Sequence, residues 1–246
     1  MSVFMKKVIL KIMAKLGFSR TNQLLYIDLE QDPVFTSISN TARAFTMTTK
    51  EGMKALYDAV NYISKNNITG DIVECGVWRG GSSMVSALTL LHNKDTNRNL
   101  YLYDTFEGMS KPSDIDVSIL GESALEHWQE KHKCFADFDD VNVNIIATKY
   151  PKDKIHLIKG MVENTIPKTM PDKIAILRLD TDWYESTYHE LVHLYPKLVK
   201  GGVLIIDDYG CWKGSKKAVD TYFEENNISV FLHRVDYAVR IIVKTN

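Results

Sequence analysis

Two short apolar runs in the second half of the chain each end in acidic residues. The runs are residues 174–179 and 201–206, and the acids that follow them are Asp180, Asp182, Asp207 and Asp208. Both runs are short, β-branched and continuously hydrophobic, which is typical of strands buried in a parallel sheet. Ligands of open α/β sheets bind beyond the carboxyl ends of the strands. Carboxylates that converge there repel one another unless a cation or a proton lies among them, and oxygen ligands favour Mg²⁺ or Ca²⁺.

Strands and helices alternate along the rest of the chain. Further strands are predicted at residues 71–76, 99–104 and 154–159, and helices at 49–65, 81–91, 186–198 and 216–224. Thr48 or Thr49 is the expected N-cap of the first helix. The alternation predicts an α/β, Rossmann-like fold with helices on both faces of a mostly parallel sheet. The last two strands, 228–232 and 238–243, are close enough for a hairpin, so the sheet has seven strands and an antiparallel last strand.

The size and composition of the chain predict one main domain. Its 246 residues are 45% hydrophobic, which is enough for a single core with decorations. The net charge is −1, whereas nucleic-acid-binding proteins usually carry a basic excess, so no nucleic-acid partner is expected. The three cysteines, Cys75, Cys134 and Cys211, are far apart and lack metal-ligand spacing, which predicts a reduced, cytoplasmic protein.

Residues 1–45 are expected to form an N-terminal helical arm, and residues 46–246 the main domain. The first 20 residues are apolar but interrupted by four lysines, and their longest apolar runs are too short for a signal peptide or a membrane span. A basic amphipathic helix fits this pattern, either packed on a second subunit, which we favour, or lying on an anionic membrane surface. Residues 109–154 form a long polar insertion in the main domain, and we expect it to act as a lid.

The strand at 71–76 and the one that follows it carry the features of a nucleoside site. Glu74 and Gly76 lie at the first strand end, and Ser82 and Ser83 open the next helix, whose N-terminus suits a carboxylate or phosphate. The glycine spacing is not G-x-G-x-x-G, so a dinucleotide fingerprint is absent. Asp104 ends the next strand, where an acid commonly accepts hydrogen bonds from ribose hydroxyls. These features favour a nucleoside that carries an amino acid and no pyrophosphate, which is S-adenosylmethionine.

Four segments together resemble the macrocin O-methyltransferase family, whose members methylate sugar hydroxyls of macrolides and aminocoumarins. The matching segments are residues 70–83, 103–109, 177–187 and 194–210, and the resemblance spans residues 45–245. It implies the class I methyltransferase fold, S-adenosylmethionine, and Mg²⁺ or another divalent cation. Trp183 departs from the family pattern, in which a smaller apolar residue is common, and this change would reshape the acceptor pocket.

The resemblance also assigns roles to individual residues. Glu74, Gly76 and Ser82 or Ser83 are implied to contact the methionine part of the cofactor, Asp104 and the adjacent Thr105 to lie at the ribose, and Gly160 and Met161 to flank the adenine. The implied metal ligands are Asp180, Asp207 and Asp208. Asp180 is also the implied general base, although a role as metal ligand alone stays open.

Three alternatives compete with a methyltransferase. His189 to His193 match H-E-x-x-H, a zinc-protease pattern, but this helix covers a sheet face and no third ligand is evident. Asp180-Thr-Asp182 matches the D-x-D of metal-dependent sugar-nucleotide glycosyltransferases, which is the stronger alternative. The third is a non-catalytic binding protein on this scaffold.

The sequence leaves the acceptor and the assembly open. A sugar hydroxyl of a glycoside, a nucleotide sugar or a surface-polysaccharide precursor is expected, with a homodimer and no stable membrane insertion. Two roles are open for Arg178: it pairs with an acceptor phosphate, or it satisfies neighbouring acids, which is the commoner role of an arginine in a buried strand.

Overall fold

The computed structural model describes residues 27–130 and 134–245, and its centre is a seven-stranded sheet in the order β3-β2-β1-β4-β5-β7-β6. The expected helix within the first 20 residues lies outside the described residues. The strands are β1 (Asp71–Cys75), β2 (Leu100–Asp104), β3 (Ile155–Lys159), β4 (Ile174–Leu179), β5 (Leu198–Ile206), β6 (His233–Arg234) and β7 (Arg240–Val243). Strands β1 to β5 are parallel, and β7 runs antiparallel to both β5 and β6. The predicted seven-stranded α/β sheet with an antiparallel last strand is confirmed.

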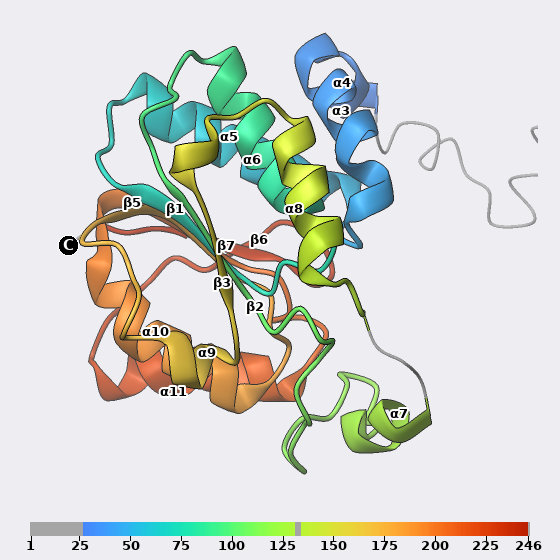
Figure 1. Ribbon diagram of the computed structural model, residues 1–246. Coiled ribbons are helices and arrows are strands. Elements are labelled where there is room, and N and C mark those ends of the chain that lie inside the picture. Colours follow the sequence, from blue (N-terminus) through green and yellow to red (C-terminus); the bar gives the residue numbers. More distant parts are fainter. Residues whose placement is uncertain (1–26, 131–133, 246) are drawn as a thin grey trace, which may run out of the picture.

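Helices cover both faces of the sheet (Figure 1). One face carries α5 (Lys50–Lys65), α6 (Gly81–His92) and α8 (Phe138–Ala147), with α3 (Ile27–Glu30) and α4 (Pro33–Ala42) packed outside them. The other face carries α9 (Val162–Thr165), α10 (Tyr184–Leu194) and α11 (Lys213–Glu225). Helix α7 (Ala124–Glu130) lies apart from both layers, and short 3₁₀ turns occupy Arg43–Phe45, Lys152–Lys154 and Tyr195–Lys197.

The core is divided by the sheet because successive strand residues point to opposite faces. In β1, Ile72 packs with the α5–α6 layer and Val73 with the α10–α11 layer, and Ile176 and Leu177 of β4 are divided in the same way. All four side chains are buried. Continuous hydrophobicity in these strands therefore reflects burial on both faces, as the sequence predicted.

Two element predictions need correction. The helix predicted at 186–198 is α10, which ends at Leu194 because Pro196 lacks an N–H and begins a 3₁₀ turn. The strand predicted at 228–232 is absent, and Phe231 there is 82% exposed. Its place in the hairpin is taken by β6, because Asp236 Oδ1 accepts the N–H groups of residues 238 and 239 and so sets the turn later in the chain.

Helix α8 lies within the segment predicted as an insertion and was not predicted. Asp137 is its N-cap and accepts a hydrogen bond from the N–H of Asp140 at 2.8 Å. Since α8 follows β2 and precedes β3, it is the crossover helix between these two parallel strands. No helix in the described ranges is long and apolar enough to cross a membrane.

Candidate functional site

The turn after β1 brings two strand ends into close contact at a glycine. Gly76 has a φ of 81°, and a Cβ on it would lie 1.9 Å from the carbonyl oxygen of Asp180. Only glycine fits this backbone conformation and this approach without a clash. Gly80, with a φ of 88°, is the N-cap of α6. The turn therefore places the start of α6 and the end of β4 on either side of Gly76.

Glu74 is the buried acid of β1, with 4% of its surface exposed. Its Oε2 accepts a hydrogen bond from the Ser83 hydroxyl, and its Oε1 accepts one from Nη1 of Arg178 at 2.8 Å. Burial raises the pKa of Glu74, and the charge of Arg178 and the Ser83 hydrogen bond oppose that rise. Ser83 thus supports Glu74 from behind, whereas Ser82 lines the cavity in front of it.

Asp104, predicted at the ribose, is already engaged by the chain itself. Its Oδ2 accepts the N–H groups of Val77 and Trp78 at 2.7 and 2.9 Å. Its Oδ1 accepts the Phe106 N–H at 2.8 Å, and the Thr105 hydroxyl, which donates to the Gly108 carbonyl at 2.5 Å, lies 3.4 Å from it. The three N–H groups use most of the acceptor sites of the carboxylate, so Asp104 ties the loop after β1 to the loop after β2. The long contact from Thr105 is the one that a ribose hydroxyl would displace most easily.

Three carboxylates converge beyond β4 and β5. One oxygen atom each from Asp180, Asp207 and Asp208 lies within 4.8 Å of the other two. Among the residues that the structure describes, this is the one group of three or more His, Cys, Asp or Glu side chains with the spacing of a metal site. An all-oxygen donor set of this kind fits a hard divalent cation such as Mg²⁺.

Arg178 lies beneath this cluster in β4 and is 3% exposed. Its Nη1 is 2.8 Å from Oε1 of Glu74 and 2.7 Å from Oδ2 of Asp180, and its Nη2 is 2.6 Å from Oδ1 of Asp207. The guanidinium therefore satisfies the neighbouring acids and is not directed at an acceptor phosphate. It also joins the predicted cofactor acid, Glu74, to two of the predicted metal ligands.

One guanidinium does not neutralise the acids around it. Burial raises the pKa of Asp180 and Asp208 well above the usual range, and neighbouring carboxylates raise it further. Burial, followed by the charge of Asp180, raises the pKa of Asp182 to about 7. The N–H of Asp182 donates to Oδ2 of Asp208 at 3.2 Å, so the backbone of Asp182 orients the side chain of a predicted metal ligand. A bound cation would reduce the repulsion among the carboxylates of this cluster.

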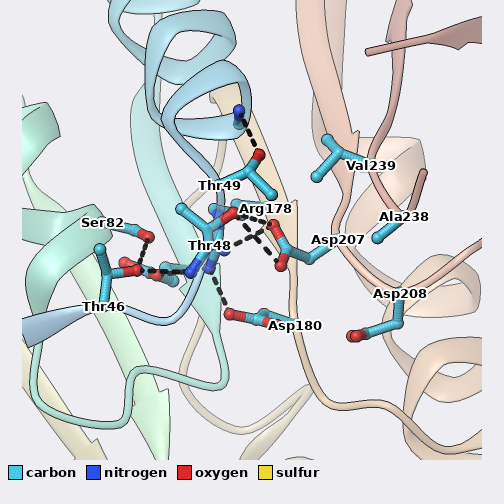
Figure 2. A network of polar contacts seen from close by, with 12 residues as sticks. Thr46, Thr48, Thr49, Ser82, Arg178, Asp180, Asp207, Asp208, Ala238 and Val239 are labelled. Atoms are coloured by element: carbon cyan, nitrogen blue, oxygen red, sulfur yellow. Dashed lines mark hydrogen bonds and ion pairs between the residues drawn. The ribbon is translucent and has the colours of Figure 1, made fainter. Parts of the chain in front are cut away.

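Residues 46–49, the threonine strap, cross the site between the 3₁₀ turn at Arg43–Phe45 and helix α5 (Figure 2). Thr46 Oγ1 lies 3.3 Å from Oγ of Ser82, and the Thr48 hydroxyl donates to Oδ1 of Asp207 at 3.1 Å. Thr49 is the N-cap of α5, as one of the two predicted alternatives. The strap was not predicted as part of the site, because its only signal in the sequence was a helix cap.

Three tryptophans, the aromatic wall, form another part of the cavity lining: Trp128, Trp183 and Trp212. The Trp183 indole N–H donates to the carbonyl oxygen of Ser110 at 3.0 Å, and the Trp128 indole N–H donates to that of Met109 at 3.2 Å. Trp183 also meets the Trp212 ring edge to face, with 5.1 Å between ring centroids. Indole groups from distant elements thus fix the beginning of the predicted insertion against the loop after β4.

One cavity of about 570 Å³ connects these features, within the usual range for a small-molecule site. Of the residues predicted to bind cofactor or metal, all but Ser83 line it. They are Glu74, Gly76, Ser82, Asp104, Thr105, Gly160, Met161, Asp180, Asp207 and Asp208. The aromatic residues Trp128, Trp183 and Trp212 line the same cavity.

The H-E-x-x-H pattern does not form a zinc site in the described part of the chain. His189 Nε2 lies 3.0 Å from the carbonyl oxygen of Ile166, and the two histidine rings are side by side. Glu190 points elsewhere, since it is fully buried and accepts from the Thr181 hydroxyl at both oxygens. These residues stabilise the packing of α10 on the sheet.

A comparison with protein-family models matches residues 8–242 to the Macrocin-O-methyltransferase (TylF) family. The chain belongs to this family. The protein is therefore an S-adenosylmethionine-dependent O-methyltransferase, so the glycosyltransferase and the non-catalytic alternatives are wrong.

Individual proteins that are similar to this chain are also O-methyltransferases. Demethyldecarbamoylnovobiocin O-methyltransferase of Streptomyces niveus is 30% identical over 195 residues, which cover 79% of this chain and 74% of that protein. The 8-demethyl-8-(2,3-dimethoxy-alpha-L-rhamnosyl)-tetracenomycin-C 4'-O-methyltransferase of Streptomyces olivaceus is 31% identical over 193 residues, 78% of this chain and 73% of that protein. The solved structure of the O-methyltransferase NovP is 28% identical, with a TM-score of 0.73 and coverage of 82% and 83% of the two chains.

Proposed function

We propose that this protein transfers the methyl group of S-adenosylmethionine to a sugar hydroxyl, with a divalent cation at Asp180, Asp207 and Asp208. The observation that carries the proposal is the convergence of these three carboxylates in the cavity that also holds Glu74 and Asp104. The name of the Streptomyces olivaceus relative specifies O-methylation of a rhamnosyl compound, which supports a sugar acceptor.

The cofactor side of the cavity is assigned to β1, β2 and the turn after β3. Glu74 and Ser82 are proposed to hold the amino-acid part, next to the turn at Gly76. Asp104 and Thr105 are proposed to meet the ribose, and Gly160 and Met161 to border the adenine. In support, all of these residues line one continuous surface of the cavity. The buried carboxylate of Glu74 also supplies the negative charge that an ammonium group needs.

The metal side is assigned to β4 and β5, where the acids have the chemistry that a divalent cation requires. When bound, S-adenosylmethionine supplies the methyl group and the cation acts as a Lewis acid that lowers the pKa of a hydroxyl. Asp180 Oδ2 is bound to Arg178, so Oδ1 is the oxygen left to ligate the cation or to take the proton of the acceptor hydroxyl.

The acceptor is assigned to the space between the acids and the indoles. Trp212, whose ring packs against the buried Trp183, offers a partly exposed apolar surface, and such surfaces suit the C–H face of a sugar ring. The part of the insertion that precedes α8, residues 109–130, is proposed to close over this space, with its first residues already fixed by Trp183 and Trp128. Substrate closure of this kind keeps water from the reacting groups.

A mass-spectrometric assay tests the proposal. The full-length protein is incubated with S-adenosylmethionine, MgCl₂ and a panel of neutral glycosides and nucleotide sugars, and each product is fragmented to locate the added methyl group. The expected result is a methyl group on a sugar oxygen and no product in excess EDTA. Methylation of the aglycone alone would overturn the acceptor assignment, and full activity in EDTA would overturn the metal assignment.

A further inference from the structure

The contacts behind Asp207 show that a residue far from it in sequence controls its orientation. We propose that Thr48 is a positioning residue, which holds Asp207 in the orientation of a metal ligand. This inference rests on the proposed metal site and adds to it a residue that makes no contact with the cation. Thr48 belongs to the threonine strap, is 8% exposed and precedes Asp207 by 159 positions.

The two oxygens of Asp207 have different surroundings. Oδ1 accepts from Nη2 of Arg178 at 2.6 Å and from the Thr48 hydroxyl at 3.1 Å, which uses both of its lone-pair sites. Oδ2 has only a 3.5 Å contact with the same hydroxyl, at the limit of a hydrogen bond. The two donors therefore fix one oxygen on the protein side and leave Oδ2 as the oxygen for a cation. Figure 2 shows both donors converging on this carboxylate.

Asp180 has only one of these two supports. Its Oδ2 accepts from Nη1 of Arg178 at 2.7 Å, and 31% of its side chain is exposed. Asp207 has the same guanidinium and, in addition, the Thr48 hydroxyl, and its side chain is 15% exposed. A single contact lets a carboxylate rotate about it, whereas two donors from different directions fix its plane. Thr48 thus makes Asp207 the more rigid of these two acids.

The strap is itself fixed at both of its ends. Thr46 contacts Ser82 on the cofactor side and accepts a hydrogen bond from the N–H of Thr48 at 3.2 Å. Thr49 accepts the N–H of Gly52 at 2.9 Å and donates to Asp236 in the hairpin turn. These contacts fix the position of the Thr48 hydroxyl, and its hydrogen bond then fixes the orientation of the Asp207 carboxylate.

The absence of a side chain at Gly52 leaves room for the Thr48 hydroxyl. A Cβ at Gly52 would lie 2.6 Å from Oγ1 of Thr48 and 3.3 Å from Oγ1 of Thr49. Glycine is a poor helix former, and Gly52 occupies the first turn of α5, where alanine would otherwise favour the helix. Glycine at this position lowers the helix propensity of α5, but it avoids a clash with the hydroxyls of Thr48 and Thr49.

Binding of Mn²⁺, measured by isothermal titration calorimetry on the full-length protein without S-adenosylmethionine, tests this role. T48V and T48A both remove the hydroxyl but differ in volume, and T48S retains it. T41V is the matched control, because the exposed Thr41 hydroxyl only donates to the Ser37 carbonyl within α4. Hydrogen-bonding partners of metal ligands typically contribute about 10- to 100-fold to metal affinity. We therefore expect about a tenfold or larger loss in T48V and T48A, and wild-type affinity in T48S and T41V.

A second titration, with S-adenosylhomocysteine, separates positioning from misfolding. If Thr48 acts through Asp207, T48V binds S-adenosylhomocysteine as the wild type does and only Mn²⁺ binding is weakened. Equal Mn²⁺ affinity of T48V and wild type would overturn the role of Thr48 and leave the metal site intact. A parallel loss of both ligands and of the melting temperature would also overturn it, in favour of a purely structural role. Absence of Mn²⁺ binding by the wild type would instead overturn the proposed metal site, and the inference with it.

Discussion

The guanidinium of Arg178 and the carboxylate of Glu74 form a buried ion pair, with Nη1 2.8 Å from Oε1. Their side chains are 3% and 5% exposed. The same nitrogen lies 2.7 Å from Oδ2 of Asp180. The guanidinium of Arg178 is therefore shared between Glu74 on the proposed cofactor side and Asp180 and Asp207 on the proposed metal side. The two halves of the site are supported by one side chain.

Replacement of the Arg178 side chain by an uncharged one is expected to lower the free energy of unfolding strongly. R178M keeps much of the volume but leaves Glu74 buried without its charged partner, and removal of one member of a buried pair typically costs about 3–5 kcal/mol. Urea unfolding followed by circular dichroism measures the free energy of unfolding. R79M is the control, because Arg79 pairs with Asp140 at a surface where both side chains are 35% exposed, and it should cost less than about 1 kcal/mol. Equal losses in the two variants would contradict the prediction.

Replacement of Asp180 is expected to affect turnover far more than cofactor binding. D180N keeps the shape of the side chain but removes the base and one charge of the metal cluster, so kcat should fall by about 100-fold or more. Methyl transfer is measured by mass spectrometry, and the affinity for S-adenosylhomocysteine by calorimetry. D58N is the control, since Asp58 is an exposed acid of α5 paired with Lys54. Activity within a few-fold of wild type in D180N would rule out Asp180 as the base.

The acids of this site could be predicted from sequence, because each follows a strand and strand ends meet at one edge of a parallel sheet. Thr48 could not, because its contact with Asp207 depends on the path of an irregular segment that no periodicity encodes. Asp104 ends β2, as the sequence predicted, but the sequence did not reveal that backbone N–H groups already bind its carboxylate. Resemblance to a family identifies a position and says little about how many of its hydrogen bonds are already used.

The errors in secondary structure have local causes. Helix α8 was missed because Val141, Val143 and Ile145 alternate as in a strand, which conceals its helical period. The hairpin was misplaced because its turn depends on the side chain of Asp236, and hydrophobicity does not report such contacts. Strands β4 and β5 were found because burial on both faces leaves an unbroken apolar run.

The aromatic wall gives a prediction about acceptor binding. W183F retains a ring but loses the indole N–H that holds the Ser110 carbonyl, so the first residues of the insertion become less well positioned. A hydrogen bond of this kind contributes about 1 kcal/mol, which corresponds to roughly a fivefold rise in the KM of the acceptor. The KM of S-adenosylmethionine should stay unchanged and serves as the internal control. A rise confined to the KM of S-adenosylmethionine would place Trp183 on the cofactor side.

The acid cluster predicts how pH affects the protein when divalent cations are removed. Burial and the charge of Asp180 raise the pKa of Asp182 to about 7, whereas in the unfolded chain it titrates near the ordinary value of about 3.9. The folded state therefore binds a proton that the unfolded state releases, so the stabilising effect is complete below about pH 4 and is lost as the pH rises through 7. Urea unfolding in EDTA should show stability falling between about pH 4 and pH 7 and levelling off above pH 7, and saturating MgCl₂ should reduce the fall because a bound cation neutralises the same charges. D182N should show a smaller fall in EDTA than the wild type, and an identical fall would mean that other groups cause the dependence.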